Sequence, residues 1–228
     1  MRRPGQPTGQ PPPPRVSAAA AAAVRDWPRY FDAVGDAGPR ETLVEAVNRV
    51  NADRGQPIDA ANPPLAIDFG CGTGRDTIEL LTRGWRVLAL DGEAEALARL
   101  RARPELAALR ASDRLECRLA TFEEAAFPRC TLFNASYTLP FCPPACFCDL
   151  WRRIVDAIEP GGRFAGQLFG EEDDWAALPD RTHHRREQLD DLFRGFEIEW
   201  LKTDLYGPEP ASAYPKRWHI FHIVARKR

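Results

Sequence analysis

The sequence predicts a three-layer α/β sandwich, in which a seven-stranded, mostly parallel sheet carries helices on both faces. Short apolar runs alternate with amphipathic segments through most of the chain, which is typical of strands joined by helices. A turn with three glycines in five residues, 70–74, follows the first apolar run. The last two apolar runs, 196–200 and 218–225, have no helical segment between them. This final pair predicts that the last strand is antiparallel.

The individual elements are predicted from apolar periodicity and from the glycines and prolines that bound each segment. The segment 41–52 places Leu43, Val47 and Val50 on one helical face. Gly84 gives the helix that begins at residue 75 a C-terminal stop. The predicted order after the first helix is strand 65–69, helix 75–84, strand 85–90, a helix from 93 interrupted by Pro104, strands 115–120 and 131–137, helix 143–158, turn 160–162, strand 163–169, helix 182–193, and strands 196–200 and 218–225.

Residues 1–25 differ in composition from the rest of the chain. Four consecutive prolines, 11–14, are followed by the alanine run 18–23. Prolines cannot build a packed core, so this segment is predicted to be disordered or polyproline-like. The alanine run is too weakly hydrophobic for a secretory signal, and no segment approaches the ~20 apolar residues of a membrane span. Residues 26–228 are predicted to form one domain.

The charges nearly balance, with a formal net charge of −2 over 228 residues. Bulk electrostatics therefore gives no reason to expect binding to nucleic acid. The six cysteines form no C-x-x-C pair, and the four histidines complete no zinc-finger spacing, so no metal site is predicted. The cysteines at 142, 146 and 148 are interpreted as reduced thiols rather than as a soft-metal site. Reduced thiols favour the cytoplasm.

The glycine-rich turn is the strongest functional signal. Glycines at every second position let the backbone bend sharply and pass close to a ligand. The dinucleotide fingerprint requires a third glycine where this chain has Arg75 or Thr77, and the phosphate-binding P-loop requires Gly-Lys-Ser/Thr. Neither pattern is present. Asp68 ends the strand before the turn, and Asp91 ends the next strand, where a carboxylate suits a ribose diol.

Asp68, Gly70, Gly72 and Gly74, followed by Asp91, resemble the first motif and the ribose-binding acid of class I S-adenosylmethionine (SAM)-dependent methyltransferases. The resemblance implies a Rossmann-like fold, SAM as cofactor and S-adenosylhomocysteine (SAH) as product. It also implies adenine contacts after the third strand and contacts near the reactive methyl group after the fourth. The cofactor-binding residues that we predict are Asp68, Gly70, Cys71, Gly72, Gly74, Asp91, Gly92, Thr121, Phe122 and Asn134.

Two tyrosines are predicted to position the reactants. Tyr30 precedes the first long helix, where related enzymes carry a lid, and its alternative role is amphipathic packing. Tyr137 closes the segment Asn134-Ala135-Ser136-Tyr137, which matches the Asp/Asn-Pro-Pro-Tyr/Phe motif of amino-group methyltransferases only at its ends. Its alternative role is a core residue. Arg40 is interpreted either as a partner of the cofactor carboxylate or as a solvated helix start.

The predicted function is a SAM-dependent methyltransferase (EC 2.1.1.-) that acts on a small-molecule acceptor and binds neither nucleic acid nor a membrane. Its layout resembles the small-molecule and tellurite-resistance-like group of that superfamily. Three alternatives stay open: a macromolecular acceptor, favoured only by arginines near both termini; a SAM-binding protein without catalysis; and a nicotinamide-dependent oxidoreductase, which Arg75 disfavours.

Overall fold

A twisted sheet of eight strands forms the centre of the computed structural model, which describes residues 17–35, 37–109, 113–208 and 214–228. The strand order is β3-β2-β1-β4-β5-β8-β7, and the short β6 pairs with β5. The strands are β1 (Leu65–Phe69), β2 (Arg86–Asp91), β3 (Leu115–Leu119), β4 (Cys130–Ala135), β5 (Ile158–Gly170), β6 (His183–His184), β7 (Phe196–Tyr206) and β8 (Trp218–Lys227).

The sheet is parallel except at β8, which pairs antiparallel with both β5 and β7. From β1 the chain adds β2 and β3 on one side, and then returns to add β4 and β5 on the other. The strand order therefore reverses between β1 and β4. At such a reversal the loops after two adjacent strands turn away from each other and leave a crevice at their carboxyl ends.

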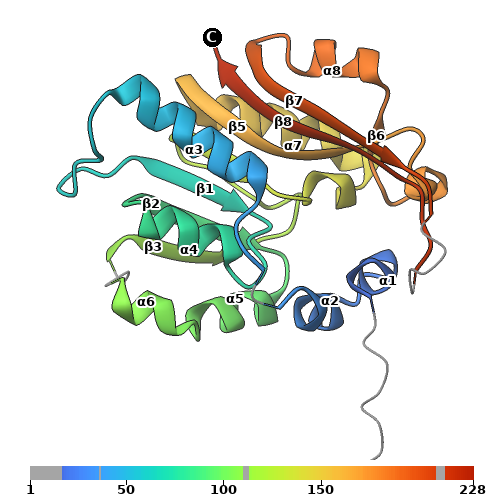
Figure 1. Cartoon of the computed structure of the whole chain (residues 1–228), viewed down its shortest axis with the longest axis horizontal. Helices are drawn as coiled ribbons and strands as arrows, with labels where there is room; N and C mark the ends of the chain where they lie inside the picture. The colour runs from blue at the N-terminus through green and yellow to red at the C-terminus, as the bar shows by residue number, and fades with distance from the viewer. Residues whose placement is uncertain (1–16, 36, 110–112, 209–213) are drawn as a thin grey trace, which may run out of the picture.

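Helices cover both faces of the sheet, and each face has its own buried core. Ala66 and Ile67 are adjacent in β1 yet belong to different cores, because successive strand side chains point to opposite faces. In Figure 1, α3 and α4 lie in front of the sheet and α7 lies behind it. The helical segments are α1 (Ala18–Ala23), α2 (Trp27–Val34), α3 (Glu41–Arg54), α4 (Arg75–Thr82), α5 (Ala94–Arg101), α6 (Pro104–Ala108), η2 (Leu139–Phe141), α7 (Pro144–Ala157), η3 (Asp174–Ala177) and α8 (Arg186–Leu192).

This architecture confirms the predicted three-layer sandwich with an antiparallel last strand. Three local predictions were wrong. β4 ends at Ala135, so Tyr137 lies outside the strand. β5 begins at Ile158 and includes the predicted turn 160–162. The register of its pairing with β4 shifts between Cys130 and Leu132, so that β5 pairs with β4 both before and after this turn. Thr182 is held in an extended segment by hydrogen bonds to the backbone oxygens of 140 and 142, so β6 forms there and α8 begins at residue 186.

The prediction of disorder was also wrong for residues 17–25, while residues 1–16 lie outside the described residues. Ser17 caps α1 by accepting a hydrogen bond from the Ala20 N–H at 3.1 Å. Ala22 is buried in a cluster that includes Phe141 and Trp175. Apolar burial and a side-chain cap thus order the alanine run. None of the helices in the described ranges is long and apolar enough to cross a membrane.

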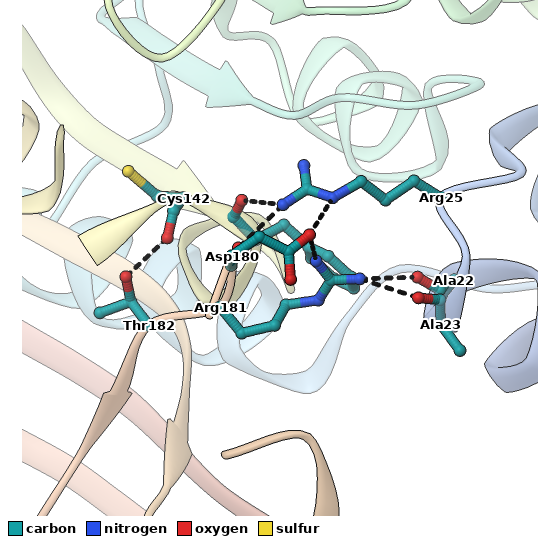
Figure 2. A network of polar contacts seen from close by, with 8 residues as sticks. Ala22, Ala23, Arg25, Cys142, Asp180, Arg181 and Thr182 are labelled. Atoms are coloured by element: carbon teal, nitrogen blue, oxygen red, sulfur yellow. Dashed lines mark hydrogen bonds and ion pairs between the residues drawn. The ribbon is translucent and has the colours of Figure 1, made fainter. Parts of the chain in front are cut away.

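Arginines tie α1 to the loop that precedes β6. Arg25 forms an ion pair with Asp180 at 2.9 Å, and Arg181 pairs with the same carboxylate. Arg181 also donates to the carbonyl oxygens of Ala22 and Ala23, at 3.3 and 3.1 Å, as Figure 2 shows. These contacts join segments about 155 residues apart in the sequence. They fix α1 and α2, which lie side by side in Figure 1, over one edge of the molecule.

The close contact of β4 with β5 gives a test of the core. A Cβ on Gly166 would lie 2.7 Å from the backbone oxygen of Ala135 and 3.0 Å from the ring of Phe164. Because the two strands would have to separate, we expect Gly166→Ala to reduce the free energy of unfolding by about 1–3 kcal/mol in urea denaturation. Gly195→Ala is the matched control, since nothing lies within 4 Å of its Cβ. Equal losses in the two variants would contradict this explanation.

Candidate functional site

A cavity of about 400 Å³ lies at the carboxyl ends of β1, β2, β3 and β4, and α2 contributes to its wall. This volume is within the range of small-molecule pockets, roughly 300–1,000 Å³. Ten of the twelve residues predicted from the sequence line the cavity, although they come from separate parts of the chain. They are Tyr30, Asp68, Gly70, Cys71, Gly72, Asp91, Gly92, Thr121, Phe122 and Tyr137. Gly74 and Asn134 do not line it.

The turn after β1 is folded back onto β2. The backbone N–H groups of Gly70 and Cys71 both donate to the Leu90 carbonyl oxygen, at 2.8 and 3.0 Å. Gly70 has φ +72°, and a Cβ there would lie 2.0 Å from the hydroxyl oxygen of Thr138. That hydroxyl is itself fixed by donating to the Phe69 carbonyl oxygen at 2.8 Å. Glycine is therefore required at residue 70 by both conformation and space.

Gly74 has a different role from the one predicted. It has φ +90° at the start of α4, and a Cβ there would lie 2.2 Å from the Leu100 side chain of α5. It permits close packing of two helices and forms no part of the cavity wall. The close approach of α5 therefore explains why glycine stands at residue 74 of the motif.

Both carboxylate oxygens of Asp91 are held by backbone groups. One oxygen accepts from the Gly72 N–H at 2.8 Å, and the other accepts from the Glu93 N–H at 2.9 Å. Burial is the largest influence on the pKa of Asp91 and raises it, against the opposing effect of these hydrogen bonds. Each carboxylate oxygen has further acceptor capacity toward the cavity. Asp91 is thus a pre-oriented acceptor pair.

Asn134 is buried behind the cavity, where it joins two aspartates. Its amide Nδ2 donates to Asp68 at 2.9 Å and to Asp76 at 3.0 Å. Asp68 also accepts from the Thr77 hydroxyl at 2.5 Å, and Asp76 accepts from the Ser136 hydroxyl at 2.6 Å. Asn134 therefore does not line the cavity, and its side chain instead orients two carboxyl groups that do.

The Asp68 and Asp76 carboxyl groups are both buried beside the cavity. Within the described residues, no Lys, Arg or His side chain forms an ion pair with either of them. Burial and the nearby negative charge of Asp76 raise the pKa of Asp68 to about 7. A cation bound beside this pair would favour the ionised form of Asp68. The pair is therefore suited to a positively charged ligand group.

Tyr137 is the predicted residue with the most unusual backbone. Its φ is +55°, which is uncommon for a residue other than glycine. Its N–H donates to the Gln167 side-chain oxygen at 2.9 Å, and the Gln167 amide donates to the Thr42 hydroxyl at 2.9 Å. The Arg40 guanidinium lies 4.4 Å from the centre of the Tyr137 ring. Burial raises the pKa of Tyr137 to about 12, so its hydroxyl stays protonated near neutral pH.

The structure adds residues that the predicted site did not contain. Asp76 lies two residues after Gly74, in the first turn of α4, and this position was the available sequence signal. Arg25 and Phe141 had no such signal, because distant segments bring them to the cavity. The lining residues outside the predicted set include Arg25, Trp27, Arg75, Asp76, Glu93, Ser136, Thr138 and Phe141. Arg40, for which the sequence left two interpretations open, also lines the cavity.

The comparisons with known proteins agree with this geometry. A family profile described as "Methyltransferase domain" matches residues 66–162, which run from β1 into β5. No curated protein sequence matches the chain. The matched segment is a methyltransferase domain, and the fold agrees with the resemblance of the sequence to class I SAM-dependent methyltransferases. A methyltransferase domain implies SAM as the cofactor, as predicted.

Solved structures resemble the chain over most of its length. TehB from Haemophilus influenzae aligns with a TM-score of 0.68 and 16% identity, covering 87% of this chain and 66% of TehB. The 1,6-didemethyltoxoflavin-N1-methyltransferase of Burkholderia thailandensis, solved with 1,6-didemethyltoxoflavin and SAH, aligns with a TM-score of 0.60 and 21% identity, covering 92% of this chain and 87% of that enzyme. Magnesium protoporphyrin IX methyltransferase from Synechocystis PCC 6803, solved with SAM, aligns with a TM-score of 0.62 and 14% identity, covering 91% of this chain and 97% of that enzyme. At these identities the likeness shows the fold.

The raised pKa of Asp68 predicts a pH effect on the ligand-free protein. The folded-state value of about 7 lies above the ordinary value of 3.8, so the folded protein binds more protons between these limits. The contribution of Asp68 to stability should therefore fall as the pH rises from about 4 to 7. We expect Asp68→Asn to show a smaller loss of unfolding free energy across this interval in urea denaturation. Identical pH profiles for the variant and the wild type would contradict the assignment.

Proposed function

We propose that the chain transfers a methyl group from SAM to a small-molecule acceptor, as an enzyme of the EC 2.1.1.- group. The observation that carries this proposal is the arrangement of three aspartates in the wall of one cavity. A buried aspartate pair that forms no ion pair with a described residue lies beside the turn after β1, and the anchored Asp91 lies at the end of β2. SAM carries an ammonium group and a ribose diol, which these acids match.

The other parts of the cavity wall match the remaining groups of SAM. We assign Arg40 to the cofactor carboxylate, because its guanidinium lines the cavity and forms no ion pair with a described residue. We assign Thr121 and Phe122 to the adenine, because they lie in the wall just after β3. Thr121 also caps the following turn by accepting from the Glu124 N–H at 3.3 Å, and this cap is compatible with adenine contact.

The protein's part in the reaction is mainly to orient the reactants and exclude water. SAM supplies an activated methyl group on its sulfonium. Tyr137, whose backbone N–H is held by Gln167, lines the cavity just after β4, where we place the methyl group. Trp27 and Tyr30 of α2 cover the cavity, which supports the lid role predicted for Tyr30. Because Tyr137 stays protonated, we assign it a positioning role and no role as a general base.

A small-molecule acceptor is supported by the covered cavity and by two structural neighbours. The toxoflavin enzyme was solved with a small heterocyclic substrate, and the second neighbour is named for a porphyrin. The net charge of −2 gives no general attraction to nucleic acid. We place the protein in the cytoplasm, in accord with its six free cysteines.

The assignment of Asp91 to the ribose is tested by calorimetry with SAM. Asp91→Ala removes two acceptor oxygens, so we expect binding to weaken by about 1.5–3 kcal/mol, the scale of charge-assisted hydrogen bonds. Glu93→Ala is the control, since Glu93 lines the same cavity but contributes its backbone N–H to the Asp91 contact. Unchanged affinity in a folded Asp91→Ala protein, or equal losses in both variants, would show that the ribose lies elsewhere.

The proposed activity is tested by incubating the protein with SAM and a panel of thiols, amines, phenols, carboxylates and chalcogen oxyanions. We expect acceptor-dependent formation of SAH with one of these classes. Tight NADH binding without SAM binding would overturn the proposed function in favour of an oxidoreductase. SAM binding without turnover of any acceptor class would favour a non-catalytic SAM-binding protein.

A further inference from the structure

The cavity extends beyond the groups assigned to SAM, toward α2 and η2. Aromatic rings form this part of its wall. Trp27 contacts Phe141 edge-on, with ring centroids 5.0 Å apart, and contacts Tyr30 edge-on at 5.8 Å. All three side chains line the cavity. Aromatic surfaces of this kind suit a flat apolar ligand, because ring pairs gain energy beyond the area that they bury.

Arg25 brings a positive charge to the same end of the cavity. Its Nε donates to the Asp180 carboxylate at 2.9 Å. Its Nη2 donates to the backbone oxygens of Phe141 and Asp180, at 3.1 and 2.8 Å. No described residue accepts a hydrogen bond from Nη1, which Figure 2 shows outside the dashed contacts. The guanidinium is therefore fixed in orientation and keeps one nitrogen for a ligand.

The local charge balance favours an anion. Asp180 is the carboxylate partner of Arg25, but it is shared with Arg181. Two guanidinium groups thus face one carboxylate. The Arg181 guanidinium also lies 4.8 Å from the Phe141 ring centre, so both positive charges adjoin the aromatic wall. A ligand with a negatively charged oxygen would balance the excess charge.

We propose that Arg25, Trp27 and Phe141 form the acceptor subsite, and that the acceptor is a planar aromatic molecule with an anionic oxygen group such as a carboxylate. This inference rests on the proposed methyltransferase function. Arg25 binds the anionic group through Nη1, and the ring of the acceptor lies against Trp27 and Phe141. The aromatic wall favours flat acceptors, and the guanidinium favours acceptors that carry a negative charge.

The test compares 2-naphthoate with 2-naphthamide, which share shape and differ in charge. Binding of each compound to the full chain saturated with SAH is measured by calorimetry, so that the cofactor-facing arginines are already covered. We expect the naphthoate to bind at least about tenfold more tightly than the amide. Equal affinities, or no binding of either compound, would overturn the proposal. Failure of SAH itself to bind would instead overturn the proposed function.

Two variants separate ligand binding from a purely structural role of Arg25. Arg25→Gln should remove the preference for the naphthoate and leave SAH affinity unchanged. Asp180→Asn breaks the same ion pair but keeps the Arg25 charge, so the preference should persist or increase. Loss of the preference in both variants would show that Arg25 only holds α1 in place, and its retention in Arg25→Gln would show that another group binds the anion.

Discussion

The site depends on the hydrogen bonds that Asn134 makes to two buried aspartates. This amide joins the ends of β1 and β4 to the first turn of α4 through Asp68 and Asp76. Asp76 also accepts from the Arg40 N–H at 2.9 Å and so fixes the start of α3. One side chain thus sets the spacing of four elements around the cavity. Because the group is buried, each lost hydrogen bond would leave a desolvated polar atom.

The same arrangement explains why the site favours a cation. Asn134 orients the two carboxyl groups but cannot neutralise them, since an amide carries no charge. Burial then disfavours ionisation of Asp68, whose pKa rises to about 7. Binding of a cation beside Asp68 and release of its proton are therefore linked near neutral pH. Asp91 is also buried, but its two backbone hydrogen bonds lower its pKa and oppose the larger raising effect of burial.

The sequence predicts the sheet and ten residues of the cavity wall because both depend on short-range patterns. Alternation of strands and helices gives the layers, and acids at strand ends meet because parallel strands end at one edge. Gly74 and Asn134 lie behind the cavity wall. The place of a residue along a turn or strand does not specify whether it reaches the cavity. The ordering of α1 depends on Arg181, about 158 residues away, and no local pattern at the alanine run signals that partner.

Backbone strain in the described residues is concentrated at the cavity. Arg25 and Tyr137 are the two residues other than glycine with positive φ there, both at +55°, and both side chains line the cavity. Such a conformation costs of order 1–3 kcal/mol and persists only where other contacts enforce it. Gln167 holds Tyr137, and Asp180 holds Arg25. The fold therefore holds one strained residue just after β4 and one just before α2, and both line the cavity.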